Sequence, residues 1–246
     1  MLKAKQPMSR IPSLHFLASL LNFHARSEKS ILNSGVNKDA VFYVLNPENN
    51  LPKTQVDTLL YLHKASIVQV LIFVYMTGHK TCTLLTLQNR LEPALKKNEE
   101  WEGLTGQAPT PGRLAQVLGT KDAFIYSGHG SGSQYLSSDE IEKLKVRLVP
   151  LLFGCSSAQL NRYGRNVDPI GIVQSYLVGS SPALVGFLWP VTDMDVDHWT
   201  LEFLDYWLTG QEGELLQAVA DKRASFNHFT NSCALVVYGL PIGVKL

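Results

Sequence analysis

The sequence predicts an α/β domain with a mostly parallel sheet flanked by helices, and three observations lead to this fold class. Short, almost continuous apolar runs recur along the chain and suit strands that are covered on both faces. Segments with the apolar spacing of helices lie between these runs. The sequence has no internal repeat and no tract of low complexity, so one sheet with its crossover helices accounts for the whole pattern.

The predicted strands are runs rich in Val, Ile, Leu and aromatic residues. They cover residues 41–45, 67–75, 123–126, 148–153 and 183–188. The most apolar run, over residues 65–76, falls short of the roughly 20 residues that a membrane-spanning helix needs. We therefore expect no membrane association from this run.

Helices are predicted between and after the strands. The first is capped by Thr110, opened by Pro111 and stopped by Gly119. Gly179 and Gly210 stop two of the others. The remaining predicted helices cover residues 138–145, 170–178, 195–208 and 213–226.

Composition and charge narrow the function classes. With 45% hydrophobic and 17% charged residues, the chain can bury the core of an ordinary globular domain. Its 22 Lys and Arg balance 21 Asp and Glu, so no basic field predicts direct nucleic-acid or lipid binding. The three cysteines are too few and too scattered for a disulfide framework, which predicts a reducing compartment, and we expect no secretion signal.

Two predicted strands end in loops that carry reactive side chains. The strand at 123–126 runs into a glycine-rich loop with His129, and the strand at 148–153 runs into Gly154 and Cys155. Parallel strands deliver such groups to the crevice beyond their carboxyl ends. A neighbouring imidazole raises the thiolate fraction of a cysteine and later protonates a leaving amine. The pair therefore predicts a thiol nucleophile, Cys155, with His129 as its acid/base partner.

The glycines beside this pair suit a second task. Gly130 and Gly154 let the backbone approach a substrate carbonyl closely. The backbone N–H groups of Gly130 and Cys155 are therefore the predicted oxyanion hole.

Other interpretations of these residues are weaker. A cysteine after an apolar strand is often an inert small hydrophobe, and a histidine in a glycine loop can merely serve a turn. Glycines 128, 130 and 132 only loosely imitate a dinucleotide-binding loop. No serine has the glycine spacing of a nucleophile elbow. His79 and Cys82 have no second ligand pair, so we expect no metal site and no cofactor.

Three acidic residues alternate after the last predicted strand, at Asp193, Asp195 and Asp197. Carboxylates at this place suit the N-terminus of the next helix. An equally open interpretation is that one of them lines a pocket for a basic substrate side chain.

These segments resemble the signature blocks of separase, a caspase-like cysteine protease family. The main blocks are YSGHGSGSQYL (126–136), LLFGCSS (151–157) and LWPVTD (188–193). FYVLNP (42–47), NLPKT (50–54) and YGLP (238–241) are similar to further family blocks. The resemblance covers most of the chain from about residue 40 onward.

The resemblance implies a caspase-like α/β sandwich with a His129/Cys155 dyad and without a required third catalytic carboxylate. It also implies cleavage after arginine in the kleisin subunit of cohesin, which releases sister chromatids, and control by securin. Asp197 is the first choice for the arginine pocket, with Asp195 and Asp193 behind it. Cytoplasmic and nuclear localisation would follow.

The resemblance also implies how the chain is organised into domains. Residues 1–40 are expected to be an N-terminal helical lead-in, and residues 41–246 the caspase-like protease domain. Within it, residues 56–90 are similar to neither flank and are predicted to be an insertion or a gene-model artefact. The family pattern has Asp where this chain has Pro190. The alternative function is therefore a catalytically silent interaction module or truncated isoform, and a nucleotide-binding protein is a more distant one.

Overall fold

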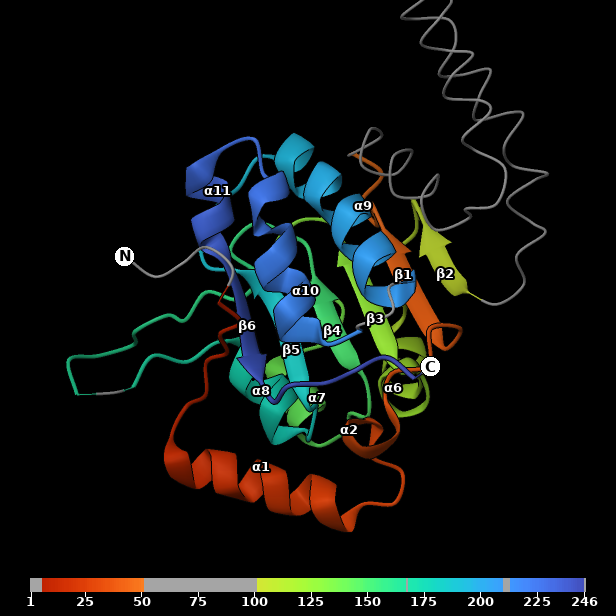
Figure 1. The fold of residues 1–246 in the computed structure, drawn as a ribbon, viewed down its shortest axis with the longest axis vertical. Helices are drawn as coiled ribbons and strands as arrows, with labels where there is room; N and C mark the ends of the chain where they lie inside the picture. Colours follow the sequence, from red (N-terminus) through yellow and green to blue (C-terminus); the bar gives the residue numbers. More distant parts are fainter. Residues whose placement is uncertain (1–5, 51–100, 167, 210–212, 246) are drawn as a thin grey trace, which may run out of the picture.

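The computed structural model describes residues 6–50, 101–166, 168–209 and 213–245, which form a six-stranded sheet between layers of helices (Figure 1). The strands are β1 (Val41–Leu45), β2 (Glu102–Thr105), β3 (Ala123–Ser127), β4 (Val149–Leu152), β5 (Ala183–Phe187) and β6 (Leu235–Gly239). Their order is β2-β1-β3-β4-β5-β6, and all neighbours are parallel except β5 and β6. The predicted α/β class with a mostly parallel sheet is confirmed.

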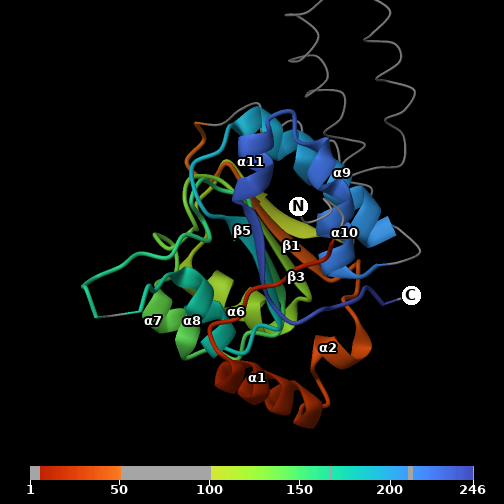
Figure 2. The ribbon, with the colours of Figure 1, turned by 60° about the vertical axis from the view of Figure 1, so that its left-hand side comes forward.

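Both faces of the sheet are buried because helices cover each of them, and alternate residues of each strand point into the two resulting cores. In β1, Tyr43 belongs to one hydrophobic core and Phe42 to the other. Helices α9 (Asp193–Thr209) and α10 (Leu215–Lys222) cover the first face, as Figure 2 shows. The second face is covered by α6 (Pro111–Thr120), α7 (Ser138–Glu142) and α8 (Ile172–Val178).

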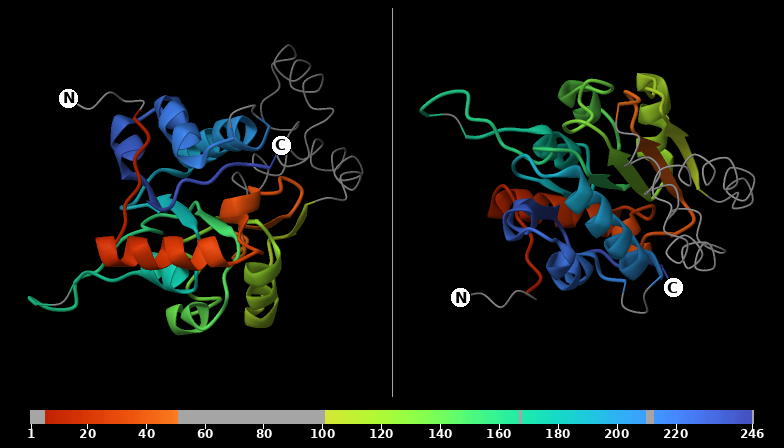
Figure 3. Two further views of the ribbon diagram at one scale, coloured as in Figure 1. Left: turned by 60° about the horizontal axis from the view of Figure 1, so that its bottom comes forward. Right: turned by 90° about the horizontal axis from the view of Figure 1, so that it is seen from above.

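The N-terminal segment wraps around this sandwich. It contains α1 (Leu14–Arg26), seen in front in the left view of Figure 3, and α2 (Ile31–Ser34). Leu20 of α1 is buried in the second core. Arg10 forms a bridge to Tyr238 of β6, so this segment is tied to the last strand. None of the helices in the described ranges is long and apolar enough to cross a membrane.

The helix boundaries follow local capping. Thr110 caps α6 as predicted, with its side chain accepting from the Arg113 N–H at 3.3 Å, but the helix ends at Thr120, one residue after Gly119. Helix α7 stops at Glu142, before the predicted end, because the chain turns toward β4 and the Val146 N–H donates to a carbonyl outside the helix. Helix α9 begins two residues earlier than predicted.

Some elements of the fold were not predicted from the sequence. They are β2, β6 and helix α11 (Phe229–Ala234), whereas the helix predicted at 213–226 forms as α10 followed by the 3₁₀ helix η1 (Arg223–Ser225). The predicted strand at 67–75, the predicted insertion at 56–90, and His79 and Cys82 lie outside the described residues.

Candidate active site

The carboxyl ends of β3 and β4 bring the predicted reactive residues together. The two strands are parallel neighbours, with Tyr126 opposite Leu152. His129 follows β3 closely and Cys155 follows β4 closely, so both loops emerge at the same edge of the sheet. His129 and Cys155 line the same small pocket, together with Gly128 and the backbone before Cys155.

Glycine allows the two loops to touch. A Cβ atom at Gly154 would lie 2.0 Å from the Gly130 oxygen and 2.5 Å from the Gly128 oxygen. No side chain tolerates such contacts with backbone atoms. From the sequence, Gly154 was expected to serve the approach of a substrate; in the structure this glycine lets the histidine loop approach the cysteine loop.

The turn that carries Cys155 is held firmly. The Cys155 thiol donates to the Val191 carbonyl, with Sγ 3.1 Å from the oxygen. The next residue, Ser156, has a φ of +56°, a left-handed conformation that is costly for a non-glycine residue. The hydroxyl of Ser157 donates to Leu152 at 2.6 Å and accepts from the Phe187 N–H at 3.1 Å. These bonds fix the turn to both β4 and β5.

The imidazole of His129 is exposed and has partners that the sequence analysis missed. Its Nε2 lies 3.2 Å from Asn50 Oδ1 and 4.0 Å from Glu48 Oε2. Both partners belong to the loop after β1, the strand beside β3. Their place after a predicted strand was the signal that could have identified them.

The histidine backbone is fixed as well. The Tyr126 hydroxyl donates to the His129 carbonyl at 2.7 Å. Burial, and then the neighbouring Tyr135, raise the pKa of Tyr126, so this hydroxyl keeps the proton that it donates. Among the described residues, the imidazole and the Cys155 thiol do not hydrogen-bond to each other. Catalytic hydrogen bonds are often long without substrate and tighten when it binds.

Two backbone donors are available beside the thiol. In the described part of the chain, neither the Gly130 N–H nor the Cys155 N–H donates to another group. Gly130 has a φ of +63°, and a Cβ atom there would meet no atom within 4 Å, so this side of the loop is open. The arrangement is compatible with the predicted oxyanion hole.

The three acidic residues have different surroundings. Asp193 is exposed and Asp197 is buried, and both line the pocket of His129 and Cys155. Asp195 is also buried, but its oxygens accept from Asn227 at 2.9 Å and from Asn231 at 2.8 Å. Asp195 is therefore the least suited of the three to bind a substrate.

The lowered pKa of Asp195 indicates that its carboxylate stabilises the fold. Burial by itself raises the pKa of this carboxyl, but hydrogen bonds from Asn231, Asn227 and His228 outweigh it and lower the pKa to about 2. The carboxylate lies in the first turn of α9, where a negative charge stabilises the helix. The helix-terminus interpretation thus fits Asp195, while the pocket interpretation remains open for Asp193 and Asp197.

The pocket is small as it stands. Its cavity volume is about 20 Å³, which has room for about one water molecule. An arginine side chain needs more space than this volume. No group of three His, Cys, Asp or Glu side chains within the described ranges could hold a metal ion.

Comparisons with known proteins agree with the sequence blocks. The family described as separin, protease domain, matches residues 80–196, which include His129 and Cys155. The mouse separin is 32% identical over 242 residues, and the Schizosaccharomyces pombe separin 30% identical over 248 residues. These alignments cover 98% and 96% of this chain, but only 10% and 11% of the relatives, so the chain spans about a tenth of their length.

Solved structures are similar in fold. A Saccharomyces cerevisiae separase–securin complex matches 99% of this chain with a TM-score of 0.74 and 25% identity. A second structure of this complex gives a TM-score of 0.71 and 26% identity over 98% of the chain. Both matches cover 14% of the longer chain. The resemblance inferred from the sequence blocks is confirmed.

Proposed function

Because this chain is related to the separin protease domain, we propose that it is a cysteine endopeptidase with Cys155 as nucleophile and His129 as acid/base. One observation carries the proposal: two loops from neighbouring parallel strands bring a thiol and an imidazole to one pocket. The Gly130 and Cys155 N–H groups, which donate to no group in the described ranges, support acyl-transfer chemistry.

In the proposed reaction, His129 takes the proton of the Cys155 thiol, and Sγ attacks the scissile carbonyl carbon. The oxygen of the tetrahedral intermediate accepts from the N–H groups of Gly130 and Cys155. The carbon–nitrogen bond then breaks as His129 protonates the leaving amine. Water, deprotonated by His129, hydrolyses the thioester and restores the thiol.

We further propose a substrate and an inhibitor of the separase type. Relatives named separin, and solved complexes of a separase with securin, support cleavage of the cohesin kleisin subunit and inhibition by securin. Activity in the cytoplasm and nucleus would follow from this role. Asp197 and Asp193 support arginine specificity, since both line the pocket beside the thiol and carboxylates bind a guanidinium in a bidentate manner.

The test is cleavage of a kleisin-type peptide with arginine at the scissile position. We expect the purified chain to cleave it and the Cys155→Ala and His129→Ala variants to lose at least about a hundredfold in kcat/KM. Replacing that arginine by norleucine should abolish cleavage by the parent. The Asp197→Asn variant should no longer prefer the arginine peptide to the norleucine peptide. Cleavage that survives Cys155→Ala would contradict the proposal.

The silent interaction module is a second candidate, which the small pocket volume favours. Alkylation separates the two, because the chain holds its own reference thiol. Cys233 is more exposed than Cys155, so without activation it should react faster with iodoacetamide. Faster alkylation of Cys155, slowed by His129→Ala, supports the enzyme. The opposite order, with no cleavage by a folded parent, supports the silent module.

A further inference from the structure

The loop after β1 has a shape that its own side chains determine. The Asn46 N–H donates to the Ser127 carbonyl at 2.8 Å, which ties the loop to the end of β3. Asn46 is fully buried, with a φ of +48°, and its Oδ1 accepts from the Asn50 N–H at 2.9 Å. Asparagine tolerates this left-handed conformation well. The loop is therefore built to hold Asn50 at a fixed place beside the histidine loop.

The contact between Asn50 and His129 determines which nitrogen of the imidazole carries a proton. An amide oxygen only accepts, so Nε2 must donate to Asn50 Oδ1 across the 3.2 Å between them. In the neutral ring, Nδ1 is then the unprotonated nitrogen. It is the atom that can take the thiol proton of Cys155.

A wider network supports this contact. Asn50 Nδ2 donates to Glu48 Oε2 at 3.4 Å, which orients the amide with its oxygen toward the ring. Gln134 donates to Glu48 Oε1 at 3.4 Å and to the Tyr126 hydroxyl at 3.3 Å. Tyr126 in turn holds the His129 carbonyl. The side chain and the backbone of His129 are thus positioned by connected groups.

We infer that Asn50 is a positioning residue that keeps His129 protonated at Nε2 and directs Nδ1 to the thiol. This inference rests on the proposed function and adds a third member to the dyad. Glu48 Oε2 lies 4.0 Å from the same ring nitrogen, Nε2, so the donor side of the ring faces acceptor oxygens. The thiolate then forms the carbon–sulfur bond, and the Nδ1 proton passes to the leaving amine.

The test compares substitutions at Asn50 that differ in the acceptor. Asn50→Ala removes the acceptor and should lower kcat by about tenfold to a hundredfold, with KM within about twofold of the parent. Asn50→Asp keeps an accepting oxygen at the same place and should restore most of the rate. Asn161→Ala, a substitution of an exposed asparagine away from the pocket, is the control for general effects on folding.

Two results would overturn the inference: a parent-like kcat for Asn50→Ala, or an equal loss for Asn50→Asp. The rate of Cys155 alkylation is measured in parallel, since it depends on the imidazole but not on turnover. If the parent cleaves no peptide while Asn50→Ala still slows alkylation and Asn50→Asp does not, the proposed function fails and the positioning role stands.

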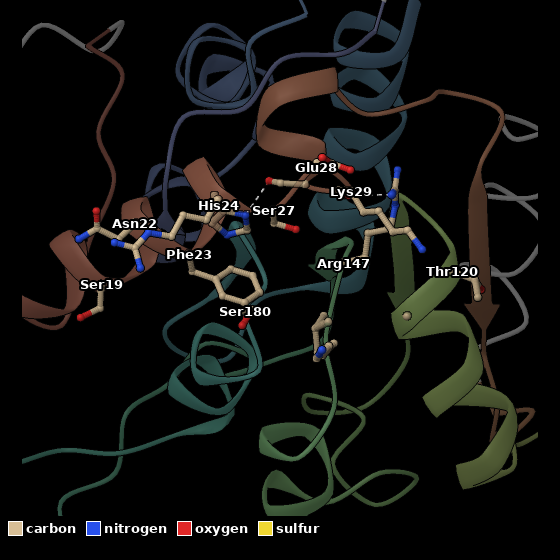
Figure 4. A pocket seen from close by; sticks show the side chains of 15 residues that line it. Ser19, Asn22, Phe23, His24, Ser27, Glu28, Lys29, Thr120, Arg147 and Ser180 are labelled. Carbon is tan, nitrogen blue, oxygen red and sulfur yellow. Dashed lines mark hydrogen bonds between the residues drawn. The ribbon is translucent and has the colours of Figure 1, made fainter.

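A second observation lies at the opposite end of the sheet. A hollow with a cavity volume of about 1170 Å³ is bounded by the end of α1 and by the segments that lead into β3, β4 and β5 (Figure 4). These strands begin here and end at the candidate active site. A ligand in this hollow would therefore not occupy the catalytic pocket.

The hollow is rich in positive charge. It is lined by Arg26, Lys29, Lys145 and Arg147, with Glu28 as the acidic residue among its lining side chains. Arg147 is paired with Asp122, with Nε 2.8 Å from Oδ1. The other three cations have exposed side chains and no ion pair within the described residues. This uneven charge contrasts with the near-neutral chain as a whole.

Apolar and hydroxyl groups line the same hollow. Phe23 is 42% exposed beside the cations. Ser19, Ser27 and Ser180 can donate or accept hydrogen bonds, and His24 forms part of the inner wall, with Nδ1 2.7 Å from Ser30 Oγ. Cations, donors and one apolar surface suit an extended peptide with acidic side chains and an apolar one. A single aromatic ring gives little surface on which nucleic-acid bases could stack.

The geometry points to a docking site for an acidic peptide in this hollow, separate from the cleavage pocket. The recognised groups are a row of carboxylate side chains, which the three exposed cations Arg26, Lys29 and Lys145 complement in charge. The probes are short fluorescein-labelled peptides with one Leu that carry Glu, phosphoserine or, as the neutral form, Gln. The Glu peptide should bind, more weakly as salt rises, and the Gln peptide should not; binding of the phosphoserine peptide without binding of the Glu peptide would overturn the carboxylate assignment.

Charge reversal tests the location. The double variant Lys29→Glu/Lys145→Glu should weaken peptide binding by about tenfold or more, and leave cleavage of a short peptide without acidic flanks unchanged. The double variant Lys38→Glu/Lys245→Glu changes the net charge equally at exposed sites outside the hollow and should bind like the parent. An equal loss of peptide affinity in both double variants would contradict this docking site. Stronger binding of single-stranded DNA than of the acidic peptides would contradict it as well.

Discussion

At the scale of single residues, the close approach of the two reactive loops depends on a missing side chain. Gly154 directly precedes Cys155 and lies against the carbonyl oxygens of Gly128 and Gly130, the two residues that flank His129. Packing of backbone on backbone leaves no flexible group that could move aside. The geometry of the proposed dyad is therefore sensitive to one methyl group.

We predict that Gly154→Ala destabilises the fold by about 1–3 kcal/mol and lowers kcat/KM by about a hundredfold, because the histidine loop must move. Urea unfolding and peptide cleavage measure the two effects. Gly112→Ala in α6 is the control, since a Cβ atom there meets no atom within 4 Å and a helical alanine gains about 0.5–1 kcal/mol. A Gly154→Ala variant with the stability and the kcat/KM of the parent would contradict the close contact between the two loops.

At the scale of elements, α9 connects the core with the pocket. Trp199, Phe203 and Trp207 stack along its buried face, with ring centroids 4.7 Å and 5.6 Å apart. Phe153 packs on Trp199 just before the turn that carries Cys155. At its N-terminus, Asp195 joins the helix to the segment that leads into α11. The position of α9 thus determines where Asp193 and Asp197 lie.

We predict that this connection weakens in acid. The folded pKa of Asp195 is about 2, below the ordinary value of 3.8, so the native state favours the carboxylate. Its stabilising contribution is complete above pH 4 and is lost as the pH falls toward 2. Urea unfolding between pH 5 and pH 2 should therefore show a shallower acid decline for Asp195→Asn than for the parent. The same loss of stability with falling pH in both proteins would contradict the lowered pKa of Asp195.

At the scale of the whole molecule, the sheet order places the supporting groups beside the reactive ones. Strand β1 lies next to β3, so the loop with Glu48 and Asn50 reaches the histidine loop from a distant part of the sequence. Strand β2 then pairs with β1 in parallel, which requires a crossover between them. Parallel connections need about a dozen residues or more.

This requirement gives a prediction for the insertion expected at residues 56–90. A chain without these residues keeps enough length between β1 and β2 for the crossover, and should fold with parent-like solubility and cleavage. A chain without residues 51–100 keeps too few and should lose the β1–β2 pairing. Circular dichroism and peptide cleavage distinguish the two deletions. Loss of folding in the shorter deletion would contradict the insertion.

The fold class and the reactive pair could be predicted from the amino-acid sequence. Continuous apolar runs mark strands buried on both faces, and parallel strands bring the residues after them to one edge of the sheet, so His129 and Cys155 could be predicted together. Strands β2 and β6 and helix α11 were missed. Strand β2 has weak β propensity, and β6 directly follows a helix without a turn residue between them.

The sequence shows that Glu48 and Asn50 follow a predicted strand, but their contact with His129 depends on the packing of distant segments. Asn50 contacts His129 because β1 and β3 are neighbours in the sheet, and strand order is not written in the local sequence. Three alternating aspartates look equivalent in the sequence, yet their directions around α9 bury Asp195 among amide donors and leave Asp193 and Asp197 at the pocket. Local spacing fixes which elements form, whereas contacts between distant segments depend on how those elements pack.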